Sequence, residues 1–142
     1  VFDIALILLS ITGLAISSYF SLVSYGFGNP APWFIPSACR MDEGTCQAVI
    51  HTPDARVFGV PNSLLGMAYY AAVIVVVLAS RADGSHLPYR VLSVVSSGTV
   101  ILGIYLVYSL IARLKIRCVL CQTSHAINGC MFILLLIIIA AQ

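Results

Sequence analysis

Four of the five cysteines form two pairs whose spacing suits thiol–disulfide chemistry. Cys118 and Cys121 make a C-x-x-C pair at the start of a long apolar segment, and Cys39 and Cys46 are separated by six residues. The spacing of three predicts that Cys118 and Cys121 share one face of a helix. The N-terminal end of that helix and the neighbouring cation of Arg117 favour the thiolate, which is the reactive form. Two such pairs at one membrane face could relay electrons by thiol–disulfide exchange.

Other interpretations of the cysteines stay open at the level of sequence. Cys118 and Cys121 could be small core residues, and Cys39 and Cys46 could form a structural disulfide that staples a loop. Cys130, nine residues beyond Cys121, is predicted to be an inert packing residue. A zinc site would need two ligands besides Cys118 and Cys121, and the candidates are Cys39, Cys46, His51 and His125. We expect no metal, because no second tight C-x-x-C pair occurs.

Two polar side chains lie inside the apolar segment that follows the C-x-x-C pair. His125 and Asn128 continue the stripe of Cys118 and Cys121 at spacings of three or four. Polar side chains inside a membrane span are costly, and they usually face a cavity or a partner. His125 and Asn128 therefore either form hydrogen bonds between helices or line a pocket beside Cys121.

Asn62 is a third polar position, and it opens another apolar segment. Asn62 and Ser63 could cap a helix there, or the Asn62 amide could bind a ligand carbonyl. A dithiol in a membrane needs an electron acceptor, and the chain carries no haem, iron–sulfur or nucleotide motif. A lipid-soluble quinone fits an apolar pocket that has a few well-placed polar groups.

The composition places these residues in a membrane protein. Hydrophobic residues make up 61% of the 142-residue chain and charged residues 8%, against about 25% charge in ordinary globular chains. Four apolar segments reach the roughly 20 residues that a membrane-spanning helix needs, and we predict spans at about 4–25, 62–80, 90–112 and 118–141. The predicted fold is an all-α, four-helix transmembrane bundle, with residues 1–142 as one domain. No basic cluster is long enough to bind nucleic acid.

A long loop, at about 26–61, is expected to cap one end of the bundle. It holds five of the six prolines and the only tryptophan, and it is too apolar to extend into water. A short helix is plausible within it, near 44–50. Because the number of spans is even, this loop and the loop before Cys118 share one side of the membrane, which brings the four paired cysteines to one face.

The side on which this cysteine face lies depends on two opposing arguments. The two loops of the cysteine face carry five cations and the loop between the second and third spans carries two, which favours a cytoplasmic cysteine face. Paired cysteines favour an oxidising compartment instead. We prefer the second argument and expect the face to be periplasmic or otherwise extracytoplasmic, or luminal in the endoplasmic reticulum.

The chain resembles the vitamin K epoxide reductase family across nearly its whole length. The matching elements occur in the family's order: the loop cysteines Cys39 and Cys46, the segment VFGVPNSLLGMAYY at Val57–Tyr70, the segment GIYL at Gly103–Leu106, and CVLCQTSHAIN at Cys118–Asn128. The ordered set is specific, although no single element is. The resemblance implies an enzyme that couples disulfide formation in a thioredoxin-like partner to reduction of a quinone, which would be ubiquinone, menaquinone or vitamin K. We expect the protein to be a monomer.

The resemblance also implies a role for each cysteine of the two pairs. Cys39 would face the partner, Cys46 would reach Cys118, and Cys121 would lie nearest the quinone. Two alternatives remain: reduction of vitamin K epoxide, as in the vertebrate members, and a non-enzymatic metal-binding or scaffold protein.

Further residues match the family's quinone site. Asn62 matches an asparagine that binds a quinone carbonyl, and the positions that match pocket walls are Phe58, Leu65, Tyr69, Leu106 and Leu110. Two positions depart from the family. His125 stands where a tyrosine is usual, which affects ligand preference, and Asp54 stands where an aromatic residue is usual, which affects how the loop is anchored.

Overall fold

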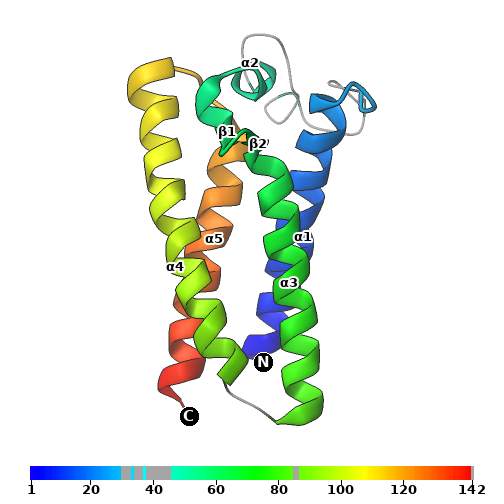
Figure 1. Ribbon diagram of the computed structural model, residues 1–142, viewed down its shortest axis with the longest axis vertical. Helices are drawn as coiled ribbons and strands as arrows, with labels where there is room; N and C mark the ends of the chain where they lie inside the picture. The colour runs from blue at the N-terminus through cyan, green and yellow to red at the C-terminus, as the bar shows by residue number, and fades with distance from the viewer. Residues whose placement is uncertain (30–32, 34–36, 38–45, 85–86, 142) are drawn as a thin grey trace.

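The protein is an elongated bundle of four long helices (Figure 1). The structure is a computed structural model, and it describes residues 1–29, 33, 37, 46–84 and 87–141. The long helices are α1 (Phe2–Ser24), α3 (Asn62–Asp83), α4 (Leu87–Tyr108) and α5 (Val119–Ala140). The short elements are α2 (Cys46–Ile50), the 3-10 turn η2 (Pro53–Ala55), β1 (Arg56–Val57), β2 (Val60–Pro61) and the π-helix η3 (Ser109–Leu114).

The four long helices are apolar enough to cross a membrane, and the predicted fold class is confirmed. Their most apolar windows have a mean hydropathy of 2.0 to 2.1, and helices of this length match a hydrocarbon layer of about 30 Å. The third span starts earlier and ends later than predicted, because Pro88 is accommodated in the first turn of α4 and η3 extends the span to Leu114. The predicted short loop helix is α2, and Gly44 lies outside the described residues.

The bundle has two different ends. Both termini lie at one end, here called the terminal end, and α2, η3 and the start of α5 lie at the other, here called the cysteine end (Figure 1). Helix α1 packs mainly on α3, and α4 packs mainly on α5, whereas the consecutive helices α3 and α4 touch much less. The α1–α3 contact is so close at Gly13 that a Cβ added there would lie 2.3 Å from Cζ of Tyr70.

The half of the bundle next to the terminal end contains the larger part of the apolar core. This core includes five side chains with no exposed surface, namely Leu6, Val73, Val77, Met131 and Leu135. At that end the Tyr89 hydroxyl donates a hydrogen bond of 3.1 Å to Asp3, and the second oxygen of Asp3 lies 3.5 Å from Arg81 Nε. These contacts tie α1, α3 and α4 together.

Candidate functional site

Cys46 and Cys118 form a disulfide at the cysteine end. Their Cα atoms are 4.8 Å apart, and the two residues are 1% and 0% exposed. The bond joins the first residue of α2 to the start of α5, so it fastens the loop segment over the bundle. Because the Cys46 sulfur is bonded to Cys118, it does not form a disulfide with Cys39 in this structure. Cys39 itself lies outside the described residues.

Cys118 lies just before helix α5 rather than within it, so the prediction that both cysteines are helical is wrong for Cys118. Cys118 is the extended N-cap residue of α5, and its sulfur accepts a hydrogen bond of 3.4 Å from the backbone N–H of Cys121. The sulfur therefore occupies the place of a capping side chain, where an unpaired backbone N–H needs an acceptor. Cys121 is a free, half-buried thiol. Cys130 is exposed on the outside of the bundle rather than packed within it.

A cavity of about 350 Å³ lies beneath the disulfide, between the cysteine end and the middle of the bundle. Its size falls within the range of small-molecule sites, and apolar atoms form most of its walls. Leu110 links the two features, because it lines the cavity and packs with Cys46 and Cys118. The predicted site residues that line the cavity are Asn62, Leu65, Tyr69, Leu106, Leu110, Cys121 and His125.

Phe58 does not line this cavity, although the sequence placed it in the wall. It lies in the two-residue turn between β1 and β2, with a φ of 52°, and Gly59 follows with a φ of 81°. Positive φ at both positions is the signature of a tight hairpin turn. Since Val57 pairs with Val60 on either side, the turn projects outward, and the Phe58 side chain is fully exposed.

The polar side chains of the cavity differ in whether they already have partners. Asn128 accepts a hydrogen bond of 2.7 Å from the Tyr70 hydroxyl, so it joins α5 to α3. His125 Nδ1 is buried and has no hydrogen-bond partner among the described residues. Gly103 makes room for this imidazole, because a Cβ there would lie 2.9 Å from Nδ1. A buried polar atom without a partner is costly, so His125 is suited to receive a ligand atom.

Asn62 is the first residue of α3, and it also lines the cavity. The interpretation of Asn62 and Ser63 as a helix cap is wrong, because Pro61 is the N-cap residue and none of the described side chains makes a capping hydrogen bond there. The Ser63 hydroxyl instead accepts a hydrogen bond of 3.0 Å from Ser21 on α1.

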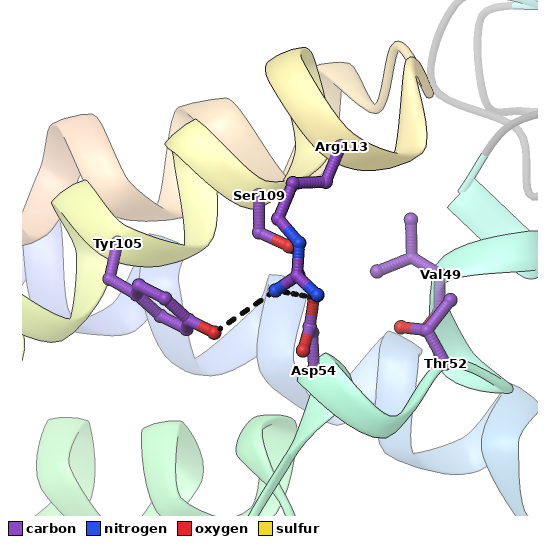
Figure 2. Close-up of polar contacts among 6 residues, drawn as sticks. All are labelled: Val49, Thr52, Asp54, Tyr105, Ser109 and Arg113. Carbon is purple, nitrogen blue, oxygen red and sulfur yellow. Dashed lines mark hydrogen bonds and ion pairs between the residues drawn. The ribbon is translucent and has the colours of Figure 1, made fainter.

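Sequence reasoning missed a polar cluster on the cavity wall. Asp54 of η2 accepts a short hydrogen bond from Ser109 and forms an ion pair of 3.4 Å with Arg113 (Figure 2). Asp54 and Ser109 both line the cavity. The signal was present in part: Asp54 replaces an expected aromatic residue, and Ser109 and Arg113 are one helical turn apart.

Comparison with known proteins agrees with this geometry. The model of the vitamin K epoxide reductase family matches residues 4–136, which is nearly the whole chain. No curated protein sequence matches the chain. Within the described ranges, no group of three histidine, cysteine or acidic side chains is placed to hold a metal. A match of this extent, over four apolar helices and a disulfide at their cysteine end, assigns the family: the chain belongs to the vitamin K epoxide reductase family.

Proposed function

We propose that this membrane oxidoreductase couples disulfide formation in a thioredoxin-like partner to the reduction of a quinone in the cavity. One observation carries the proposal: the Cys46–Cys118 disulfide lies next to a free thiol, Cys121, that faces an apolar cavity. A disulfide that only stabilised the loop would need neither the free thiol nor the cavity.

The electrons would pass between pairs of sulfur atoms. The partner's dithiol reduces the Cys39–Cys46 disulfide and itself becomes a disulfide. The Cys46 thiolate attacks Cys118 of a Cys118–Cys121 disulfide, which forms the Cys46–Cys118 bond and releases Cys121. Cys39 then attacks Cys46, which restores Cys39–Cys46 and leaves Cys118 and Cys121 reduced. That dithiol delivers two electrons and two protons to the quinone and closes to a disulfide again.

The arrangement of sulfur atoms in the structure matches the middle of this sequence. Cys46 is bonded to Cys118 while Cys121 is free, which is the state after the first exchange and before the second. Such a mixed intermediate is the required route between two cysteine pairs.

The cavity offers polar groups at fixed positions for a quinone carbonyl. His125 contributes a buried ring nitrogen that has no partner in the part of the chain that the structure describes, and Asn62 contributes an amide in the opposite helix. An apolar groove between α3 and α4 adjoins the cavity and shares Leu65 and Tyr69 with it. The groove suits a lipid tail, because its walls are apolar and α3 and α4 touch little.

The side of the membrane follows from the redox chemistry. Exchangeable disulfides persist in oxidising compartments, so the cysteine end would face the periplasm, another extracytoplasmic space or the lumen of the endoplasmic reticulum. A membrane-impermeant thiol reagent applied to intact cells tests this, because it would label the reduced cysteine end only from outside the cytoplasm.

The central experiment measures oxidation of a reduced thioredoxin-like protein by the purified enzyme with a quinone. Cys121→Ala is expected to abolish quinone-dependent turnover, and Cys130→Ala is the matched control, because Cys130 is the other free cysteine of α5 and lies on its outer face. Full turnover by the Cys121→Ala variant would overturn the mechanism. Stoichiometric zinc without bound quinone would instead favour a non-enzymatic metal-binding protein.

Reduction of vitamin K epoxide is a second candidate, favoured by the position of Asn62 in the cavity wall. The same dithiol would supply two electrons and two protons, and the products would be a quinone and water. Replacing the quinone by its epoxide in the assay distinguishes the two, since only an epoxide reductase consumes the epoxide.

A further inference from the structure

The segment that carries Cys46 has a second fastening besides the disulfide. One oxygen of Asp54 accepts a hydrogen bond from the Ser109 hydroxyl, and Nη1 of Arg113 lies 3.4 Å from the same oxygen. Nη1 of Arg113 is also 3.4 Å from the Tyr105 hydroxyl. Figure 2 shows Asp54 opposite this row of side chains, which come from α4 and η3. We call the contacts of Asp54 with Ser109 and Arg113 the Asp54 clamp.

The Asp54 clamp is joined to Cys46 through a short, ordered stretch of chain. Asp54 follows Cys46 by eight residues, and α2 occupies the first part of the interval. The backbone N–H and the hydroxyl of Thr52 both donate to the carbonyl of Val49, at 3.0 and 2.7 Å. These two bonds fix the turn between α2 and η2, so a constraint on Asp54 also restrains α2.

The proposed reaction requires the bond between Cys46 and Cys118 to open and re-form in every cycle. While that bond is open, the disulfide no longer holds α2 at the cysteine end. We propose that Asp54 is a positioning residue, which keeps Cys46 within reach of Cys118 whenever the bond between them is open. This inference rests on the proposed function, since only an exchanging disulfide needs a second fastening.

The length of the tether sets the size of the effect. With the Asp54 clamp in place, Cys46 is eight residues from a polar fastening, whereas without it the chain is next fastened at Asn62, sixteen residues away at the start of α3. The apolar packing of Val49 and Ile50 on the bundle is present in both cases. Doubling a flexible tether lowers the effective concentration of its end about threefold. Loss of orientation in α2 would add to this and the packing of Val49 and Ile50 would oppose it, so about threefold is the effect expected.

The test measures how readily the Cys46–Cys118 bond forms, without any quinone. The background carries Cys39→Ser, Cys121→Ser and Cys130→Ser, so that only this disulfide exchanges with glutathione. One disulfide and two glutathione thiols then give two protein thiols and one oxidised glutathione. The fraction oxidised is read in glutathione buffers of graded ratio by alkylation with a thiol reagent that shifts the band on a gel.

Asp54→Ala is expected to lower the equilibrium constant for forming the bond about threefold. Ser109→Ala, which removes a single hydroxyl, should shift it in the same direction by less. Asp3→Ala is the matched control, because Asp3 also accepts from a hydroxyl and pairs with an arginine but lies at the terminal end. It should leave the constant unchanged.

An equilibrium constant that is the same in Asp54→Ala and its parent would overturn the proposal. If Asp54→Ala did not fold, an unchanged constant in Ser109→Ala would do so. Because the assay contains no quinone and no Cys121, its result is independent of whether the enzyme reduces quinones.

Discussion

The two ends of the bundle are fastened by similar contacts that hold different parts of the chain. At the terminal end, Asp3 accepts a hydrogen bond from Tyr89 and pairs with Arg81, and its side chain is 26% exposed. At the cysteine end, Asp54 accepts from a serine and pairs with Arg113, and it is 23% exposed. The chemistry and exposure of the two carboxylates are therefore nearly the same.

What differs is the kind of element that each aspartate holds. Asp3 joins α1 to α3, which already pack on each other, and to α4, which packs mainly on α5, so its contacts supplement many others. Asp54 holds a short segment that is otherwise attached through the Cys46–Cys118 bond, the packing of Val49 and Ile50, and the start of α3. The same pair of contacts thus adds to a permanent structure at one end and, in the proposed mechanism, restrains an exchanging one at the other.

Packing follows the same division. The half next to the terminal end has a core of completely buried side chains, whereas the half next to the cysteine end encloses the cavity. Stability is therefore expected to depend mainly on the first half and reactivity mainly on the second. Substitutions matched between the halves test this separation.

The largest effect on stability is expected from Leu135→Ala in the packed half. Leu135 is completely buried, and truncation of a buried leucine leaves a void that costs about 2 kcal/mol or more of the free energy of unfolding. Leu110→Ala should cost less, because Leu110 already borders a cavity, but it should raise the KM for the quinone. Unfolding in a denaturing detergent and steady-state kinetics measure the two quantities. Equal losses of stability in both variants would contradict the division of roles.

The next largest effect is expected from Gly103→Ala in the cavity half. The added Cβ would lie 2.9 Å from His125 Nδ1, so the imidazole must move, and overpacking of this kind costs about 1–3 kcal/mol. If His125 binds the quinone, the KM should rise about tenfold, since each 1.4 kcal/mol of binding energy is a factor of ten. Gly129→Ala is the control on α5, because a Cβ there meets nothing within 4 Å. A KM that stayed at the wild-type value in Gly103→Ala would remove His125 from the binding site.

The fold could be predicted from the sequence because each membrane-spanning helix is indicated by a single continuous run of apolar residues. A run of apolar residues long enough to cross the hydrocarbon must be helical, since its backbone polar groups have no other partners there. The four spans could therefore be found without knowing any contact between them. The convergence of Cys46 and Cys118 also followed, because an even number of spans places their loops on one side.

The parts of the site that the sequence did not predict depend on contacts between distant residues or on the backbone of a turn. The Asp54 clamp joins residues 55 and 59 positions apart, and no spacing rule connects them. The outward position of Phe58 depends on a positive φ in a two-residue turn. The residue type of Phe58 does not predict that backbone conformation. The N-cap position of Cys118 depends on where α5 begins, and helix ends are less certain than helix centres.

The smallest effect on the free energy of unfolding is expected from removing one charge at each end of the bundle. These two substitutions test the comparison between Asp3 and Asp54 most directly. Asp3→Asn should lower the free energy of unfolding by about 0.5–1 kcal/mol, because a partly exposed ion pair is lost while the amide oxygen can still accept from Tyr89. Asp54→Asn should lower it by less, since the segment that Asp54 holds can detach while the helices stay packed. Hydrogen exchange should then rise between residues 46 and 57 in Asp54→Asn but not in Asp3→Asn. Equal global losses, with no local rise in exchange, would mean that the two aspartates have the same structural role, and the clamp would then have no special connection to the exchanging disulfide.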